Sequence, residues 1–484
     1  MENKAYRSSP INNQPLIFWR LVLCMVIFCS ISVSFAQEAD TPPLDELDNN
    51  PIYDNITNLL GNEDENGEPT KLLTLNESLL LALERNPELE MSLERVNQAG
   101  FAAEESKAKL YPTLDFRGLN GYRYMKPFPG SAEGDSDAVN EGSIMVQLRQ
   151  LLFDGFSSTE EAKRRTQIKS SSEIEAEIVK ENTVTEAIDY YFTILRYQQA
   201  REEAGKFILE MQIIMDKINI MQQSGAASMI ELDFAKARLA SAKSEASKAA
   251  TSYNDAVANL EFLVEDLPPF HVEAPFRLGE FALMDLEHYI ELSKINNSQI
   301  RLHESKKQSQ RHRIKVEKGK RYPVVNVIVE RKRARNESGN MGYKTDSSIM
   351  LQANYRLFDG GKRRAAISKA KSKYRELSIN DRLVLRELEK EVKLAYNQVK
   401  SIRNTIATTD EEILANERLQ QLNHQNLALG EVKIIELIEV EERLFRSRTE
   451  KHKQVTDLFI NYYDLMIKSG QMKTAILGAA NAAP

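Results

Sequence analysis

The stretch SIMVQLRQLLFDG at residues 143–155 returns as SIMLQANYRLFDG at residues 348–360, 205 positions further along the chain. Each copy begins with alternating apolar and polar side chains, which is typical of a β-strand with one apolar and one polar face. Each copy ends in Phe-Asp-Gly. Asp154 and Asp359 can cap a following helix, while Gly155 and Gly360 supply the backbone freedom that a sharp strand-to-helix joint needs.

The repeat covers nearly the whole chain after residue 73. The same 205 positions separate Ile230-Glu-Leu232 from Ile435-Glu-Leu437, whereas Tyr111-Pro112 and Tyr322-Pro323 are 211 positions apart. A length difference of six residues therefore lies between the Tyr-Pro pairs and the strand motifs, and loop tips absorb such differences most easily. We expect a duplicated fold, with a first repeat over residues 73–284 and a second over residues 285–470.

Each repeat is predicted to begin with a helical region and to continue with a β-hairpin. Helical spacing from Leu75 to Leu110 stops at the first Tyr-Pro pair, because proline disfavours helix for the residue before it. The expected strands are the alternating runs at 114–118, 144–148, 325–329 and 349–355. Polar, glycine-containing segments separate the strands of each pair and are expected to be long loops, at 125–141 and 334–346.

Two exceptionally long helices are expected after the joints. The segments Ser157–Gln223 and Lys362–Leu429 contain no proline and no glycine except Gly205. At about 1.5 Å per residue, each helix would be roughly 100 Å long. Turns at Gly225 and Gly430 then start partner helices, so each repeat ends in an antiparallel helical hairpin. The fold class is therefore mainly α with β.

The N-terminal residues 1–36 have the pattern of a signal peptide. Arg20 precedes an apolar run at 21–35, and small residues at 34 and 36 favour cleavage after Ala36. Both cysteines, Cys24 and Cys29, lie inside this segment without the pattern of a lipoprotein signal. The mature chain is thus predicted to be exported, not lipidated and free of thiols.

The mature chain is acidic. Loss of three basic residues and one acidic residue with the signal peptide would change the formal net charge from −7 to −9. This charge argues against nucleic acid as a partner. Residues 37–72 are rich in Asp, Glu, Asn and Pro and are expected to form a polar lead-in. Residues 471–484 are assigned as a C-terminal tail.

Four strands per chain pose a closure problem. Small closed barrels need about eight strands, and an open sheet edge in lipid leaves backbone polar groups without partners. Several chains must therefore contribute strands to one barrel. Three protomers would supply 12 strands, together with three sets of long hairpins that would continue the barrel as a helical tube.

With its strand pairs, Phe-Asp-Gly joints, twin repeat and Gly-x5-Glu-Leu hairpin tips, the chain resembles the TolC family of outer-membrane channels. The resemblance implies a homotrimer that forms a 12-stranded β-barrel in outer-membrane lipid of a Gram-negative cell, continued by a long periplasmic α-helical barrel. It also implies a periplasmic adaptor and an inner-membrane transporter, of the ABC or the proton-driven kind, as partners. The expected function is a passive exit duct for efflux or for type I protein secretion.

The resemblance also assigns roles at the hairpin tips. The acidic constriction of the family falls on Glu436 and Glu439, and the glutamate that accepts a lock bond from the neighbouring hairpin falls on Glu231. Adaptor docking is expected around Gly225 and Gly430. The family's arginine and tyrosine of the lock are replaced by Val432 and Leu427, so the closed state is expected to be held differently.

Other functions are less well supported. A soluble periplasmic coiled-coil adaptor or structural protein would account for the helices but not for the alternating strands. No nucleophile lies beside a base in the sequence, so no enzyme and no cofactor are expected. The six histidines show no ligand spacing, so no metal site is expected either. The glutamates at the second tip have an alternative interpretation as a solvated acidic face near a helix start.

Overall fold

The computed structural model describes residues 71–124, 138–225, 227–265, 267–274, 283–337, 341–429 and 433–473. All of them belong to one structural unit, residues 58–484. The predicted signal peptide, most of the lead-in and nearly all of the tail lie outside the described residues, as do Gly430 and Val432.

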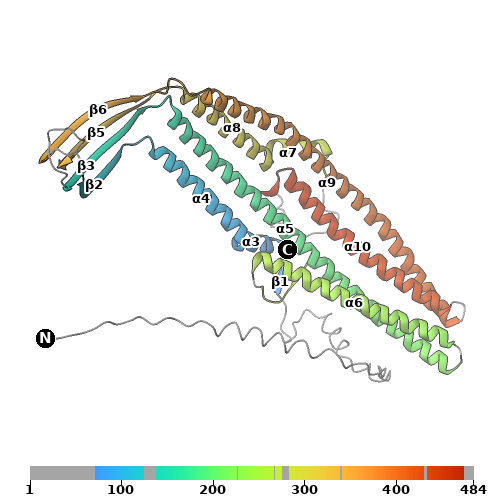
Figure 1. Ribbon diagram of the computed structural model, residues 1–484. Helices are drawn as coiled ribbons and strands as arrows, with labels where there is room; N and C mark the ends of the chain where they lie inside the picture. Colours follow the sequence, from blue (N-terminus) through green and yellow to red (C-terminus); the bar gives the residue numbers. More distant parts are fainter. Residues whose placement is uncertain are drawn as a thin grey trace, which may run out of the picture. The chain divides into compact units, whose positions relative to one another are not determined.

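The two halves of the chain contain the same series of elements (Figure 1). The first half comprises α3 (Leu75–Arg85), α4 (Pro87–Ala108), β2 (Thr113–Tyr124), β3 (Ala138–Phe153), α5 (Ser157–Gln223) and α6 (Met229–Val264). The second half comprises α7 (Leu286–Asn296), α8 (Ser298–Gly319), β5 (Val324–Arg335), β6 (Tyr343–Asn354), α9 (Lys362–Leu429) and α10 (Ile434–Lys468). Equivalent elements start 211 positions apart up to β2 and β5, and 205 apart from β3 and β6 onward. The predicted duplication is confirmed, and the length difference falls between the two strands of each hairpin.

The helical region predicted from Leu75 to Leu110 consists of two helices, because the chain breaks between α3 and α4. Asn86 has an extended conformation, and its side chain accepts a hydrogen bond from the backbone N–H of Glu88 at 2.7 Å. Pro87 then occupies the first turn of α4, where its missing N–H costs nothing. Asn297 caps α8 in the same way in the second half.

The four long strands form one antiparallel sheet in the order β2-β3-β5-β6. The central pair, β3 and β5, joins the two repeats, with Leu148 opposite Val329. The strands are longer than the sequence pattern predicted, since β3 already begins at Ala138 and β5 continues to Arg335. The predicted loops at 125–141 and 334–346 were accordingly too long.

The long helices are as predicted, with 67 residues in α5 and 68 in α9. Each starts beside the sheet and ends at the turn of its helical hairpin, and α5 packs on α6 as α9 packs on α10 (Figure 1). The core lies between the hairpins, where the rings of Phe192 and Phe459 stack with centroids 4.8 Å apart. None of the helices in the described residues combines the length and apolar character that a membrane-spanning helix requires.

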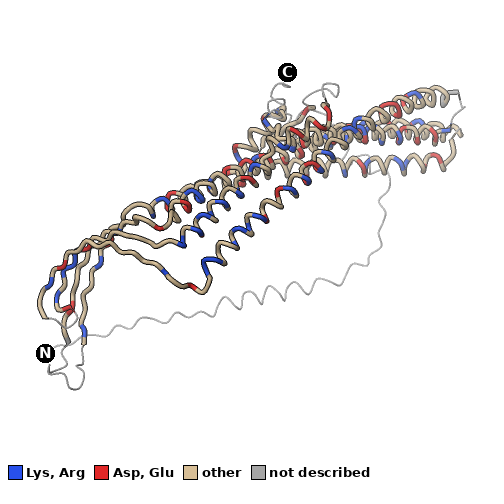
Figure 2. Tube along the Cα trace, turned by 90° about the horizontal axis from the view of Figure 1, so that it is seen from above, with Lys and Arg blue, Asp and Glu red and all other residues tan. Residues whose placement is uncertain are grey.

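Two three-residue strands, β1 (Lys71–Leu73) and β4 (Phe270–Val272), pair in parallel beside this core. The buried hydroxyl of Tyr191 donates to the carbonyl oxygens of Leu73 at 3.0 Å and of Glu273 at 2.9 Å. This side chain therefore ties the small sheet to α5. Basic and acidic residues are interspersed along the helical hairpins (Figure 2).

Candidate functional site

One face of the four-stranded sheet presents a band of apolar side chains. Leu114, Leu148, Val329 and Ile349 lie side by side across the strands through the pairings of β2 with β3, β3 with β5 and β5 with β6. Ile349 is 80% exposed and Phe116, one step along β2 on the same face, is 72% exposed. Such an apolar band on isolated strands needs a cover that the chain itself does not supply in its described residues.

The opposite face of the sheet is polar. Gln147 donates from Nε2 to Glu330 Oε2 at 3.0 Å across β3 and β5, and Arg123 pairs with Glu141 at 2.5 Å. Toward the hairpin end, Arg331 and Arg333 take the place of apolar residues on the apolar side of β5. The predicted alternation in β5 thus holds for residues 325–329, beyond which a basic rim follows.

The first Phe-Asp-Gly joint is packed tightly against the end of α8. Asp154 Oδ2 accepts a hydrogen bond from the backbone N–H of Ser158 at 2.7 Å, and Gly155 has a φ of +70°. A Cβ added to Gly319, the last residue of α8, would lie 2.7 Å from the carbonyl oxygen of Gly155 and 2.9 Å from the backbone nitrogen of Ser157. Two backbones therefore meet here with no space for side chains.

The second Phe-Asp-Gly joint also has a glycine with a positive φ, but no neighbouring element in the described part of the chain packs against that glycine. Asp359 accepts hydrogen bonds from the backbone N–H groups of Gly361 at 3.0 Å and Arg363 at 3.1 Å, and Gly360 has a φ of +62°. Within the described residues, no atom lies within 4 Å of a Cβ added to Gly360. The two joints thus share the hydrogen bond that the aspartate accepts from the backbone N–H four residues further on, and they differ in their packing.

The first helical tip is closed by a glycine and a capping box. Gly225 has a φ of +79° and donates its N–H to the carbonyl of Gln222 at 3.0 Å. Glu231 Oε2 accepts from the backbone N–H of Ser228 at 2.8 Å, and the Ser228 hydroxyl accepts in return from the Glu231 N–H at 3.3 Å. This capping box was not predicted from the sequence, although the Ser-x-x-Glu spacing is its usual signature.

The second tip lacks that box, because Lys433 stands where the first tip has Ser228. Within the described residues, the start of α10 has no side-chain cap. Glu436, the equivalent of Glu231, is therefore not engaged in capping, and both Glu436 and Glu439 are exposed on one face of α10. Gly430 and Val432, which were assigned to the second tip, lie outside the described residues.

Contacts between α5 and α10 join the two hairpins, and no sequence motif indicates them. The two helices are antiparallel, so residues further along α5 contact residues nearer the start of α10. Stacked rings, Phe192 on Phe459 and Phe207 on Phe445, alternate with polar contacts. Arg196 pairs with Asp457, and its Nε donates to the Thr456 hydroxyl at 3.0 Å.

Glu203 forms the most strongly perturbed of these polar contacts. The imidazole of His452 on α10 and the ammonium of Lys206 on α5 hold the pKa of the Glu203 carboxyl at about 2, against an ordinary value of 4.5. Its oxygens lie 2.8 Å from Lys206 Nζ, 3.9 Å from His452 Nε2 and 3.9 Å from an Arg448 guanidinium nitrogen. This carboxylate therefore joins the hairpins in its charged form.

Because the folded-state pKa of Glu203 is depressed, its contribution to stability is present above pH 4.5 and is lost as the pH falls toward about 2. We expect Glu203→Gln to destabilise the detergent-solubilised protein at pH 7, and the difference from wild type to shrink progressively below pH 4.5. Chemical denaturation at several pH values measures this difference. The neighbouring, exposed Glu202→Gln is the control and should behave like wild type; a pH-independent effect of Glu203→Gln would contradict the assignment.

The sheet, the joints and the paired hairpins define a class of protein. A sequence profile described as "Outer membrane efflux protein" matches residues 79–264 and 289–465, one match in each repeat. The chain belongs to this family. Comparison with the sequences of curated proteins gives no match.

Solved structures share the fold at low sequence identity. The Campylobacter jejuni CmeC outer membrane channel has a TM-score of 0.74 at 14% identity, covering 94% of this chain and 95% of that chain. CusC gives a TM-score of 0.72 at 15% identity, with 83% and 92% covered. The outer membrane protein VceC of Vibrio cholerae gives 0.69 at 15% identity, with 82% and 96% covered. The predicted TolC-like fold is confirmed, and family and fold are those of passive channels rather than of enzymes.

Proposed function

We propose that three copies of this chain form the outer-membrane exit duct of a tripartite efflux pump or a type I secretion system. The observation that carries the proposal is the four-stranded sheet with an exposed apolar band and a polar opposite face. In the described part of the chain, β2 and β6 each pair on one side only. In lipid the outer edges of β2 and β6 need partners, and β6 of one protomer beside β2 of the next supplies them.

Closure of a barrel requires more than one protomer, and the number that we propose is three. Four strands per chain and three chains give a 12-stranded barrel, whose polar faces enclose the passage while the apolar bands face lipid. The Arg331 and Arg333 rim at the hairpin end of β5 then lies at the edge of the membrane, where cations meet anionic headgroups. Location in the outer membrane of a Gram-negative cell follows from the barrel and from the family.

The helical hairpins extend this passage into the periplasm. Their tips, at Gly225 and the region of Gly430, are proposed to receive a periplasmic adaptor that links the duct to an inner-membrane transporter, either ABC or proton-driven. Helices of 67 and 68 residues are about 100 Å long, which is enough to bridge much of the space between two membranes. The duct itself conducts passively.

The test compares two arginine variants at adjacent positions of β6. Ile349→Arg places a charge on the apolar face, where a lipid-facing arginine costs about 2–4 kcal/mol near the bilayer midplane, incurred once per protomer. Met350→Arg places the same charge on the polar face and is the control. We expect wild type and Met350→Arg to form trimers that conduct ions in planar bilayers, and Ile349→Arg to lose membrane insertion.

A detergent-corrected mass equal to one protomer for the wild-type chain would refute the proposal. So would a wild-type chain that is extracted without detergent, as expected of a soluble adaptor. Equal insertion of both arginine variants would show that the apolar band does not face lipid.

A further inference from the structure

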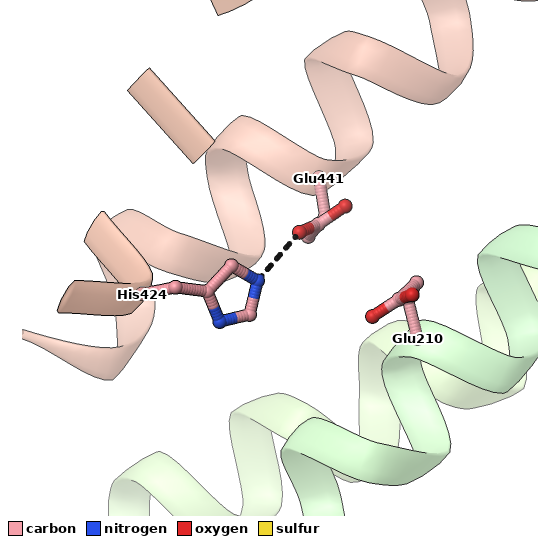
Figure 3. A group of neighbouring side chains, drawn as sticks. All are labelled: Glu210, His424 and Glu441. Atoms are coloured by element: carbon pink, nitrogen blue, oxygen red, sulfur yellow. Dashed lines mark ion pairs between the residues drawn. The ribbon is translucent and has the colours of Figure 1, made fainter. Parts of the chain in front are cut away.

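Near the hairpin tips, three side chains from three different helices converge on one point. Glu210 comes from α5, His424 from α9 and Glu441 from α10, and their potential ligand atoms all lie within 4.8 Å of one another. Figure 3 shows the two carboxylates and the imidazole directed toward a common centre. Glu210 belongs to the hairpin of α5 and α6, whereas His424 and Glu441 belong to the hairpin of α9 and α10.

The charges in this cluster do not balance. Glu441 is only 4% exposed, and a carboxylate oxygen of Glu210 lies within 4.8 Å of one of its own oxygens. Glu210 forms no hydrogen bond or ion pair with any residue that the structure describes. The half-exposed imidazole of His424, 3.4 Å from Glu441, supplies at most one positive charge for two carboxylates.

The buried carboxylate is held in place by a further side chain. Gln420 Nε2 donates to both oxygens of Glu441, at 2.7 and 2.9 Å. An amide that orients a carboxylate without neutralising it is a common outer partner of a metal ligand, and it leaves lone pairs on both oxygens for a cation.

We propose that Glu210, His424 and Glu441 bind a divalent transition-metal ion of the Zn²⁺ type, which joins the two helical hairpins of one protomer. Imidazole nitrogen with two carboxylate oxygens is a ligand set that Zn²⁺ accepts, with water in the fourth position. Bond lengths of about 2.0–2.2 Å in a tetrahedron place ligand atoms roughly 3.3–3.6 Å apart. His424 Nε2 and Glu441 Oε1, which are 3.4 Å apart, already have this separation. The carboxylate of Glu210 has to move closer to the other two ligands, and a rotation of its side chain is enough for this.

The twin repeat provides an internal comparison. At the positions equivalent to Glu210, His424 and Glu441, shifted by 205, the chain has Ala415, Asn219 and Lys236. These residues offer no comparable set, and Lys236 would repel a cation. The site is therefore specific to the interface between the two hairpins of one chain.

An effect of the bound ion on opening of the duct rests on the proposed function. If the duct opens by separating the hairpins at their tips, a bound ion resists opening, because separation breaks at least one metal–ligand bond. Binding of the ion itself does not depend on conduction, so calorimetry tests the site even if the duct hypothesis fails.

The experiment titrates Zn²⁺ into the detergent-solubilised, chelator-treated full-length protein, purified without a histidine tag. We expect one ion per protomer by isothermal titration calorimetry. His424→Asn and Glu441→Gln should each weaken binding by about 100-fold or more, and Gln420→Ala by about 10- to 100-fold. His452→Asn is the matched control, because it removes a different histidine, which contacts Glu203 of α5, and leaves all three proposed ligands in place.

Equal Zn²⁺ affinity in wild type and His424→Asn would overturn the proposal, as would an equal loss in His452→Asn. If a ligand variant fails to assemble, X-ray absorption spectroscopy of the Zn²⁺-loaded wild type decides the matter. One imidazole with oxygen ligands in a four-coordinate shell supports the site, and a six-oxygen shell overturns it.

Discussion

Replacing Gly155 by valine is expected to abolish trimer assembly, whereas the same replacement at Gly360 leaves assembly intact. Both glycines have a positive φ, +70° and +62°, so both variants incur backbone strain of about 1–2 kcal/mol. Only at Gly155 does a side chain also meet the backbone and ring of the neighbouring element, including Tyr322 Cδ2 at 2.7 Å from the added Cβ. Overpacking of this kind adds about 1–3 kcal/mol or more. Heat-modifiable migration of outer-membrane trimers on gels is the measurement.

Gly319→Ala isolates packing from backbone strain. In an ordinary helix this change stabilises by about 0.5–1 kcal/mol, because glycine loses more conformational freedom on folding. Here the added methyl carbon would lie 2.7 Å from the Gly155 carbonyl oxygen, so we expect destabilisation instead. The equivalent position in the first repeat is Ala108, which shows that the helix itself accepts alanine. A stabilised Gly319→Ala variant would contradict the importance of the contact.

The second large effect is expected at the periplasmic mouth, where we propose that Glu436 and Glu439 of three protomers form an acidic constriction. Their spacing of three residues places both carboxylates on one exposed face of α10, and the absence of a capping box leaves Glu436 available. Threefold symmetry brings six carboxylates toward the axis, which favours cations. Wild-type trimers should be cation-selective and blocked by multivalent cations, and Glu436→Gln, Glu439→Gln should lose most of both properties.

Bilayer recordings with asymmetric salt measure this selectivity, and added trivalent cations measure the block. Asp233→Asn is the matched control, because it removes an exposed carboxylate near the first tip without touching α10. If the double variant keeps wild-type selectivity and block, the two glutamates are a solvated acidic face. If Asp233→Asn changes the selectivity equally, the selectivity depends on the total charge of the tips and not on the proposed constriction.

Some features could be predicted from the sequence because they depend on local chemistry. The long helices were placed correctly because proline and glycine are nearly absent between Ser157 and Gln223, and caps and turns mark the ends. The duplication was readable because both copies retain Phe-Asp-Gly. The break at Asn86 was just as local, since asparagine before proline is a capping signal, and it was missed only because the apolar spacing continues past it.

The strand ends were harder to predict, because backbone pairing extends beyond the alternating pattern. Thr113 to Tyr124 pairs along its whole length with β3, although only its first part alternates between apolar and polar residues. The backbone hydrogen bonds between paired strands do not depend on side-chain type. The residue pattern therefore underestimates strand length where apolar and polar residues occur on both faces. The same reason explains the short estimate for β5, whose arginine-rich end remains paired with β6.

The contacts between the hairpins were decided by the tertiary structure alone. Glu203 and His452, or Glu210 and Glu441, are more than 200 residues apart, and each looks like an ordinary surface residue of a charged helix. Helical periodicity tells which residues share a face of one helix, but it does not tell which face of another helix they meet. That choice depends on the crossing and register of α5 against α10, which arise from packing of the whole unit. Local sequence features thus define the elements and their duplication, and the packing of antiparallel helices decides which charged residues meet.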